Sequence, residues 1–324
     1  MSRIFDALQR SESESSGSDP SAPPQSTELL RRAEQRAEAA WDEKASHAEP
    51  AAVSSNGSGL LVEEAGHVVN GALGVFVKGE ALAVEDRQAA IKGFPGLPVT
   101  LSADSHLVCL TDREDPAAEA VRLLGVRLRA LRRIRPLKKV LITSTIPREG
   151  KSTIAANLAC ALGHGAEEKV LLVEGDVRLP VLLTTFGVKK VPGLFDSLQE
   201  DDNLLRNIYH LEEAGIWLLP AGNVSGNPLE VLQSEKLPQL MDRLSEIFDW
   251  IIIDSPPVLP LADTSIWMRL VDGILLVTRQ GVTEKRQLQK GLEVLESQKM
   301  LGALLNSTIA SAYSDYYYRS SQNS

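Results

Sequence analysis

Short, uninterrupted apolar segments recur along this 324-residue chain after residue 105 and alternate with segments of helical periodicity. Such runs are typical of β-strands that are buried on both faces of a sheet. Strands that alternate with helices form parallel crossover units. We therefore expect an α/β fold in which helices sandwich a parallel sheet. The predicted strands are 140–143, 170–173, 216–219, 250–253, 273–277 and 301–305.

Helical periodicity marks several of the segments around these strands. Apolar residues spaced as on one helix face are Ala120, Val121, Leu124, Leu128 and Leu131. We also expect a helix from residue 151 to about residue 162, and helical patterns lie over 228–248 and 283–299.

The first 105 residues differ in composition from the rest of the chain. Residues 11–60 are rich in Ser, Pro, Ala and Glu and poor in aromatic and β-branched residues. Such a segment cannot bury enough apolar surface to offset its ordering entropy. Residues 61–105 are typical of loose structure or a linker. We expect a largely disordered N-terminal region over 1–105, a folded domain over 106–312 and a flexible tail over 313–324.

The net charge of −9 argues against nucleic acid as a partner, because the overall field of the chain repels phosphates. Cys109 and Cys160 are far apart in sequence and lie among apolar residues, so we expect buried free thiols and a reducing compartment. No apolar run approaches the roughly 18 residues that a membrane-spanning helix needs, and the N-terminus lacks the apolar region of a signal peptide. These features predict a cytoplasmic protein.

A phosphate-binding loop is predicted between the first strand and the helix that follows it. Residues 145–153 read Thr-Ile-Pro-Arg-Glu-Gly-Lys-Ser-Thr, and their place between strand and helix is the one that a P-loop requires. Backbone N–H groups and the positive end of the helix can hold phosphate oxygens. Gly150 lets the backbone approach closely, Lys151 reaches the terminal phosphates, and the Ser152 hydroxyl binds Mg²⁺. The predicted ligands are therefore ATP and Mg²⁺.

The loop departs from the general pattern at its first position, where Thr145 stands in place of glycine. The strand and helix on either side of the loop, and the carboxylates described next, outweigh this departure. The predicted nucleotide-binding residues of the loop are Glu149, Gly150, Lys151, Ser152 and Thr153.

Carboxylates follow two of the predicted strands. Asp254 ends an apolar strand, as in a Walker B motif, and Glu174 and Asp176 follow the strand at 170–173. The carboxyl ends of parallel strands meet at one edge of a sheet, beside the phosphates. We therefore expect these acids to form a magnesium and general-base cluster with Ser152.

Four of the five tyrosines lie in the last twelve residues, at Tyr313, Tyr316, Tyr317 and Tyr318. The surrounding residues are polar and lack an apolar pattern, as is usual at a mobile terminus. The tail is either an adhesive contact or a cluster of phosphate acceptors. The nucleotide site favours the second interpretation, in which phosphates would add negative charge and repulsion.

In this arrangement the chain resembles the bacterial tyrosine kinases of the capsular exopolysaccharide family (BY-kinases). The resemblance spans about residues 107–319, roughly two thirds of the chain. The segments that carry it are 115–122, 143–153, 172–180, 219–222, 227–228, 248–257 and 304–306, followed by the tyrosine-rich end.

The resemblance implies a P-loop ATPase fold of the deviant Walker group and an ATP-dependent kinase that phosphorylates its own tail, commonly between neighbouring subunits. It also implies a role in extracellular polysaccharide synthesis or export and a transmembrane activator that would recruit the protein to the inner face of the membrane. By analogy, Lys151 stabilises the phosphates, while Ser152 and Asp254 organise Mg²⁺. Asp176 and Glu174 would hold metal-bound water or accept the tyrosine proton. Asn306 resembles the position that contacts adenine.

Two residues depart from the family pattern. Glu174 stands where the family usually has Asp, which bears on metal geometry and activity. The oligomerisation motif Glu-x-x-Arg-x-x-Arg is matched by Glu119 and Arg122, but Gly125 occupies the last position. A homo-oligomer is therefore expected, with its ring form in question.

Two other functions remain open at this point. An ATP-controlled binding switch would keep Lys151 and Asp254 and use the tail as a contact. A partition or cell-division ATPase would carry a signature lysine five residues before the P-loop lysine, where this chain has Ile146. That residue argues strongly against the second function.

Overall fold

The computed structural model describes residues 84–102, 105–164, 168–199, 204–259 and 263–306. The expectations for residues 1–83 and for the tail over 313–324 lie outside these residues. No helix among the described residues has the length and apolar character needed to cross a bilayer.

Within the described ranges, seven strands form a single sheet in the order β3-β4-β2-β5-β1-β6-β7. The predicted strands are all present, most of them one or two residues longer than expected. The parallel sheet is confirmed except at one edge, where β3 runs antiparallel to β4. β3 was not predicted, because three residues are too few to form a recognisable apolar run. The strands are β1 Lys139–Ser144, β2 Val170–Glu174, β3 Tyr209–Leu211, β4 Ile216–Leu219, β5 Trp250–Asp254, β6 Gly273–Arg279 and β7 Met300–Asn306.

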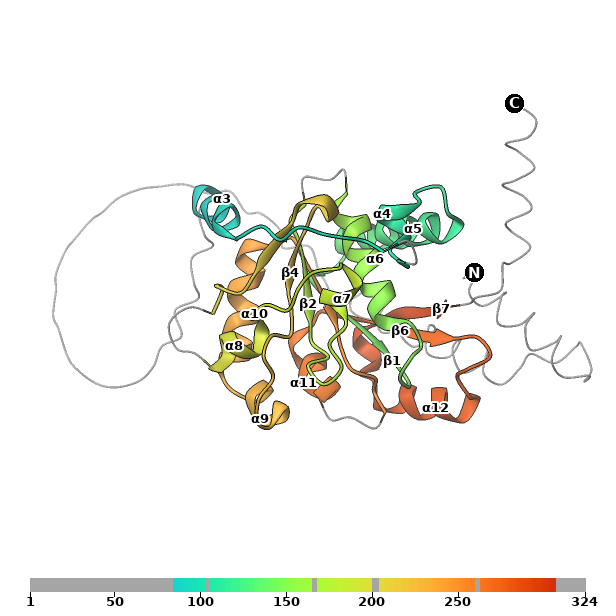
Figure 1. The fold of residues 1–324 in the computed structure, drawn as a ribbon. Coiled ribbons are helices and arrows are strands. Elements are labelled where there is room, and N and C mark those ends of the chain that lie inside the picture. The colour runs from blue at the N-terminus through green and yellow to red at the C-terminus, as the bar shows by residue number, and fades with distance from the viewer. Residues whose placement is uncertain (1–83, 103–104, 165–167, 200–203, 260–262, 307–324) are drawn as a thin grey trace, which may run out of the picture.

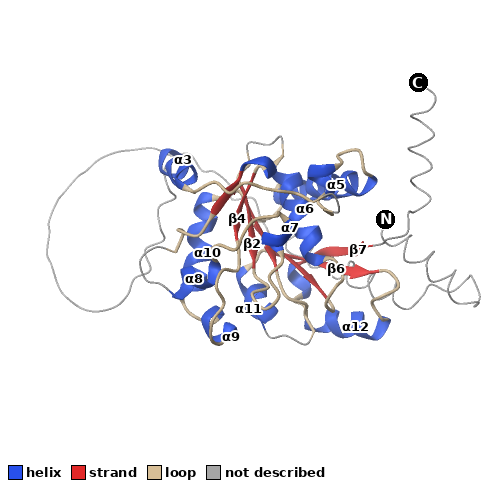
Figure 2. Ribbon diagram, in the orientation of Figure 1, coloured by secondary structure: helices blue, strands red, loops and turns tan. Residues whose placement is uncertain are grey.

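Helices cover both faces of the sheet (Figure 1, Figure 2). One apolar layer contains residues of α4 to α7, and the other contains residues of α8 to α12. The helices are α3 Val84–Gly93, α4 Val108–Thr111, α5 Pro116–Arg132, α6 Lys151–Gly163, α7 Leu182–Thr185, α8 Leu194–Gln199, α9 Pro228–Leu232, α10 Lys236–Ile247, α11 Asp263–Leu270 and α12 Lys285–Val294, with 3₁₀ turns at Glu212–Ala214 and Ser297–Lys299.

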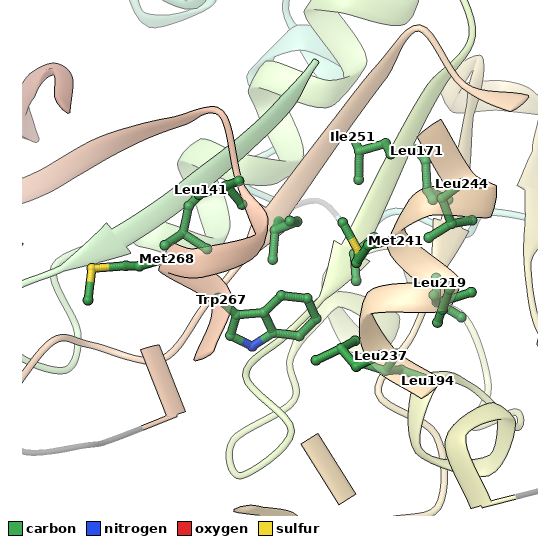
Figure 3. Packing of buried hydrophobic residues seen from close by; sticks show 14 of the residues in the cluster. Leu141, Leu171, Leu194, Leu219, Leu237, Met241, Leu244, Ile251, Trp267 and Met268 are labelled. Atoms are coloured by element: carbon green, nitrogen blue, oxygen red, sulfur yellow. The ribbon is translucent and has the colours of Figure 1, made fainter. Parts of the chain in front are cut away.

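Side chains of the central strands alternate between the two layers. In β5, Trp250 and Ile252 pack with α5 and α6, whereas Ile251 and Ile253 pack on the opposite face. Because neighbouring side chains of a strand point to opposite faces, a continuous apolar run fits a sheet covered on both sides. Figure 3 shows the second layer, where Trp267 of α11 lies among side chains of the sheet and of α10.

The helical pattern over 228–248 corresponds to two helices, α9 and α10. Asn227 caps α9 by accepting a hydrogen bond from the Leu229 N–H, and α10 begins only at Lys236. Pro238 explains the break. Its ring would clash with the carbonyl four residues earlier, so a helix can contain it only in the first turn.

The helix expected over 283–299 is shorter than predicted. Glu284 and Gln287 form a capping box at the start of α12, which ends at Val294. Thr283 stays outside the helix, where its hydroxyl donates a hydrogen bond to Glu149. This contact connects the segment before α12 to the phosphate loop.

Residues 84–102 belong to the same packed unit, although the sequence places them before the boundary expected at residue 106. α3 packs against α10, and the Phe94 and Phe248 rings stack with their centroids 6.0 Å apart. His210 of β3 donates to the Pro95 carbonyl and accepts from the Leu97 N–H through its backbone. The packed unit therefore begins no later than residue 84.

Replacing Trp267 tests this packing, because its side chain connects α11 to the loop at the carboxyl end of β2. The side chain is fully buried, and its indole N–H donates to the Gly175 carbonyl at 3.2 Å. Trp267→Ala should lower the free energy of unfolding by about 3–5 kcal/mol through the cavity it leaves. Urea unfolding measures this loss, with Trp267→Phe as a control that should cost clearly less. A loss below about 1 kcal/mol for the alanine variant would contradict the described packing.

Candidate functional site

The loop between β1 and α6 has the backbone form of an anion-binding nest. Arg148 and Gly150 both have positive φ angles, 68° and 93°, on either side of Glu149. Alternating conformations of this kind turn successive N–H groups toward one concavity. Gly150 is also the N-cap of α6, so the positive end of a 13-residue helix lies at the same point. The loop therefore has the features of a phosphate cradle.

Residues from the ends of β6 and β7 hold this loop in shape. The buried Glu149 carboxylate accepts hydrogen bonds from the Ile146 N–H at 2.7 Å and from the Thr283 hydroxyl. The Asn306 side-chain amide donates to the Glu149 carbonyl at 3.0 Å, and an Arg279 N–H donates to the Arg148 carbonyl at 3.3 Å. These bonds fix the loop before any ligand arrives.

Asn306 also explains why residue 150 is glycine. A Cβ atom at Gly150 would lie 2.1 Å from the Asn306 Nδ2 atom, and the φ of 93° is itself unfavourable for other residues. Asn306 stands at the carboxyl end of β7, beside the loop, as the expected nucleotide contact requires. In this structure its amide binds the loop backbone.

The side chains predicted to act on phosphate and metal meet at the carboxyl edge of the sheet. The Lys151 Nζ atom lies 2.9 Å from the Asp176 Oδ2 atom and 3.8 Å from the Asp254 Oδ1 atom. The same ammonium donates to the Ser152 hydroxyl at 3.2 Å. All four side chains are therefore within one cluster, although they come from the first turn of α6 and from the ends of β2 and β5.

Asp254 lacks the hydrogen bonds that a buried carboxylate normally has. It is fully buried, and neither carboxylate oxygen has a hydrogen-bond partner among the described residues. Burial raises the pKa of this carboxyl to about 7, against the lowering effects of Lys151 and of the nearby Ser152 hydroxyl, which approaches the carboxylate without the geometry of a hydrogen bond. Buried polar atoms are rarely left unpaired, and such exceptions call for an ion or a water as partner.

The donor set around Asp254 fits Mg²⁺. Mg²⁺ prefers oxygen ligands and usually takes one or two carboxylates together with substrate phosphates. Asp254 and Asp176 supply the carboxylates, and the Ser152 hydroxyl lies within the same cluster. Within the described residues, no group of three or more His, Cys, Asp or Glu side chains could hold a metal ion alone. An ion shared with a phosphate ligand agrees with both observations.

Glu174 has a different environment from the other two acids. One carboxylate oxygen accepts from the N–H groups of Val181 and Leu182, and the other accepts from the Ala221 N–H at 3.0 Å. Burial raises the pKa of this carboxyl, while the three N–H donors oppose the rise. Its side chain therefore joins the loop after β2 to the loop after β4.

The loop after β2, which carries Asp176, is held at several points. The second Asp176 oxygen accepts from the Leu179 N–H at 3.2 Å. Arg178 forms two hydrogen bonds with the buried Asp263 of α11, at 2.6 and 3.1 Å. The Gly175 N–H donates to the Asp254 carbonyl at 2.7 Å. Asp176 thus has a fixed position relative to Lys151.

Of the remaining predicted site residues, Thr153 is the one that the structure describes. Thr153 lies half-buried in the first turn of α6, and its carbonyl accepts from the Asn157 amide. Tyr313, Tyr316, Tyr317 and Tyr318 lie outside the described residues. Sequence reasoning missed Thr283, Asp263 and Arg279, because each acts through one contact between segments that are distant in sequence.

A hollow of about 510 Å³ lies away from this cluster, at the amino ends of β2 and β5. It is lined by Arg129, Arg132, Arg133, Glu168 and Asp249. Arg129 and Arg132 both pair with Glu168, at 2.7 and 3.4 Å. These arginines are therefore occupied in a structural network. The two cysteines, as expected, are buried and free.

Comparisons with known proteins identify relatives of this chain. A family model described as cellulose biosynthesis protein BcsQ matches residues 140–307. The tyrosine-protein kinase YwqD of Bacillus subtilis (strain 168) is 33% identical over 221 residues, which cover 67% of this chain and 93% of YwqD.

Two further relatives come from Escherichia coli. The tyrosine-protein kinase etk of strain K12 is 30% identical over 206 residues, which cover 63% of this chain but only 28% of etk. This chain therefore spans less than a third of that protein. The solved kinase domain of Escherichia coli tyrosine kinase ETK has a TM-score of 0.60 at 24% identity, over 71% of this chain and 97% of that domain, and supports the fold alone. On the strength of the YwqD match and this fold, the chain belongs to the bacterial tyrosine-kinase (BY-kinase) family, which has the P-loop ATPase fold.

Proposed function

We propose that this protein transfers the terminal phosphoryl group of ATP to tyrosine hydroxyls, including those of its own tail at Tyr313, Tyr316, Tyr317 and Tyr318. The observation that carries the proposal is the cluster of Lys151, Asp176 and Asp254 beside a phosphate nest, in which the Asp254 oxygens have no hydrogen-bond partner among the described residues. The relationship to YwqD and etk, both named tyrosine-protein kinases, supports the choice of acceptor.

Each side chain has a defined task in this reaction. The loop N–H groups and Lys151 would hold the phosphate oxygens, and Ser152 and Asp254 would hold Mg²⁺, which would supply charge neutralisation at the phosphates when bound. The phenol oxygen forms a bond to the γ-phosphorus as the bond to the leaving ADP oxygen breaks. The phenol has a pKa near 10, so Asp176 accepts its proton as transfer proceeds.

Glu174 contributes to this reaction by position. Its oxygens accept three backbone N–H bonds, which hold the loop that carries Asp176. Glu149 acts similarly on the phosphate loop, and Asn306 supplies the adenine-side contact. Positioning and charge neutralisation are the main sources of rate in phosphoryl transfer, so such supporting residues matter.

We infer that the protein works in the cytoplasm, beside the membrane, with a transmembrane activator of the polysaccharide co-polymerase kind. The family model, whose description names cellulose biosynthesis, supports a role in extracellular polysaccharide synthesis or export. Nucleic acid is not expected as a partner, given the net charge of −9.

A homo-oligomer is supported by the outer face of α5. Glu119 and Arg122 pair with each other at 2.7 Å, and Gly125 is buried against Leu162 of α6. The motif residues are thus partly used within the chain. Exposed apolar side chains lie along the outer face and just beyond the helix end, at Leu123 (43%), Val126 (58%) and Ile134 (75%). Apolar surface of this kind is typical of protein contacts.

An ATP-controlled binding switch is the second candidate, because the matched family model describes a biosynthesis protein without naming a kinase. Purified protein with ATP and Mg²⁺, with and without the activator's cytoplasmic segment, separates the two. Bound ATP with no phosphotyrosine under either condition would favour the switch.

Replacing the P-loop lysine tests the site. Lys151→Met should reduce phosphotyrosine formation more than about a hundredfold, because the ammonium that stabilises the phosphates is lost. Anti-phosphotyrosine labelling measures the loss, and circular dichroism checks that the fold is retained. Lys290→Met, on the exposed side of α12, is the matched control and should label normally. Labelling of Lys151→Met at the wild-type level would refute the site.

Replacing all four tail tyrosines by Phe tests the acceptor. Most self-labelling should disappear, since Tyr209, the fifth tyrosine, is buried and its hydroxyl donates to the Pro192 carbonyl. Mass spectrometry of the wild-type and variant proteins maps the phosphates. Persistent labelling at Tyr209 or at serines would count against the tail as acceptor.

A charge on the outer face of α5 tests the oligomer. Val126→Glu should shift the protein toward monomer in light scattering, because it places a charge within the exposed apolar face. Ala117→Glu, at the exposed start of the same helix, is the control. An unchanged mass for Val126→Glu would mean that this face does not form the contact.

A further inference from the structure

Arg148 adopts a backbone conformation that side chains other than glycine rarely tolerate. Its φ of 68° is positive, and it is the one non-glycine residue of this kind in the part of the chain that the structure describes. In the left-handed region, Cβ crowds the following carbonyl oxygen, which costs free energy. Glycine would take this position in the loop without that cost. Strain of this kind often accompanies a functional role for the residue.

The backbone of Arg148 is fixed, whereas its side chain is available. Its carbonyl accepts the hydrogen bond from Arg279, and its neighbours Pro147 and Glu149 restrict the chain further. The side chain is exposed. Among the described residues, no hydrogen bond or ion pair involves its guanidinium. The folded loop therefore presents a free positive charge next to the nest.

The charges around the nest leave a need for such a cation. Among the described residues, Lys151 is the only cation paired with Asp176 and Asp254, and Glu174 is buried at the same sheet edge. Arg279 donates to the Arg148 carbonyl on the loop. Arg178 is committed to Asp263 through two hydrogen bonds. A nucleotide di- or triphosphate adds further negative charge. A fixed positive group beside buried acids and phosphates therefore stabilises the bound nucleotide more strongly than the same group would in water.

We propose that the Arg148 guanidinium binds phosphate oxygens of the nucleotide, so that the strained loop residue contributes binding affinity. This inference rests on the proposed ATP site and adds a second cationic contact to it. Arg is suited to the task because its planar N–H groups match phosphate oxygens and it always carries its charge. ADP and ATP should both benefit, because the loop cradles the phosphates that they share.

Calorimetric titration of the full chain with Mg-ADP and with Mg-ATP tests the proposal. Arg148→Gln keeps a long side chain but removes the charge, and should weaken both ligands by about tenfold. Arg148→Lys should lie between it and the wild type. Arg243→Gln, with the same charge change at an exposed position of α10, should bind as the wild type does.

The strain is tested separately by heating the protein without nucleotide. Arg148→Gly removes the crowded Cβ and should raise the melting temperature by about 1–3 °C, while nucleotide affinity falls as in Arg148→Gln. If Arg148 served only to shape the loop, the melting temperature and the nucleotide affinity of Arg148→Gly would change in the same direction.

One result overturns the inference while leaving the proposed function intact, namely wild-type affinity of Arg148→Gln for both nucleotides. If that variant also has a higher KM for an acidic tyrosine peptide, Arg148 contacts the acceptor instead. Failure of the wild-type protein itself to bind either nucleotide would instead refute the ATP site.

Discussion

The pairing of β5 between β1 and β2 is the constraint on which the rest of this structure depends. In that register Asp254 lies opposite Ile142 on one side and opposite Glu174 on the other. β2 and β5 end at the same level of the sheet. Their pairing therefore places Asp176 and Asp254 beside Lys151 at the start of α6. A slip of one residue would turn the apolar side chains to the wrong layers. The core therefore fixes the position of the chemistry.

The site combines buried charge with backbone contacts that make the burial tolerable. A buried carboxylate is costly unless it is paired or hydrogen-bonded. Glu174 meets that requirement through three N–H donors, and Asp176 through Lys151 and the Leu179 N–H. Asp254 has the Lys151 ammonium at 3.8 Å but no hydrogen-bond donor within the described residues. The contrast distinguishes acids that hold the loops from the one that remains open to an ion.

Much of the fold was readable from the sequence because each buried strand is a continuous apolar run. The strand at 216–219 was predicted with its observed bounds, and α6 within one residue. β3 was missed because a short edge strand buries little and carries no periodic pattern. The two helices within 228–248 could have been separated by attention to Pro238.

The site was partly predictable for a similar reason. The P-loop and the strand ends are local patterns, so Lys151 and Asp254 could be named in advance. The roles of Glu174 and Thr283 depend on which backbone atoms face them after folding. No local pattern encodes the contact between Thr283 and Glu149, which lie 134 positions apart.

Residues 84–102 act as a strap over one end of the sheet, and this bears on how the protein is divided into fragments. The strap stacks Phe94 on Phe248 and extends the edge of the sheet beyond β3. A fragment cut at residue 106 would expose aromatic surface and unpaired backbone groups at that edge. Exposed edges of this kind invite aggregation. An excised domain should therefore retain the strap and start upstream of α3.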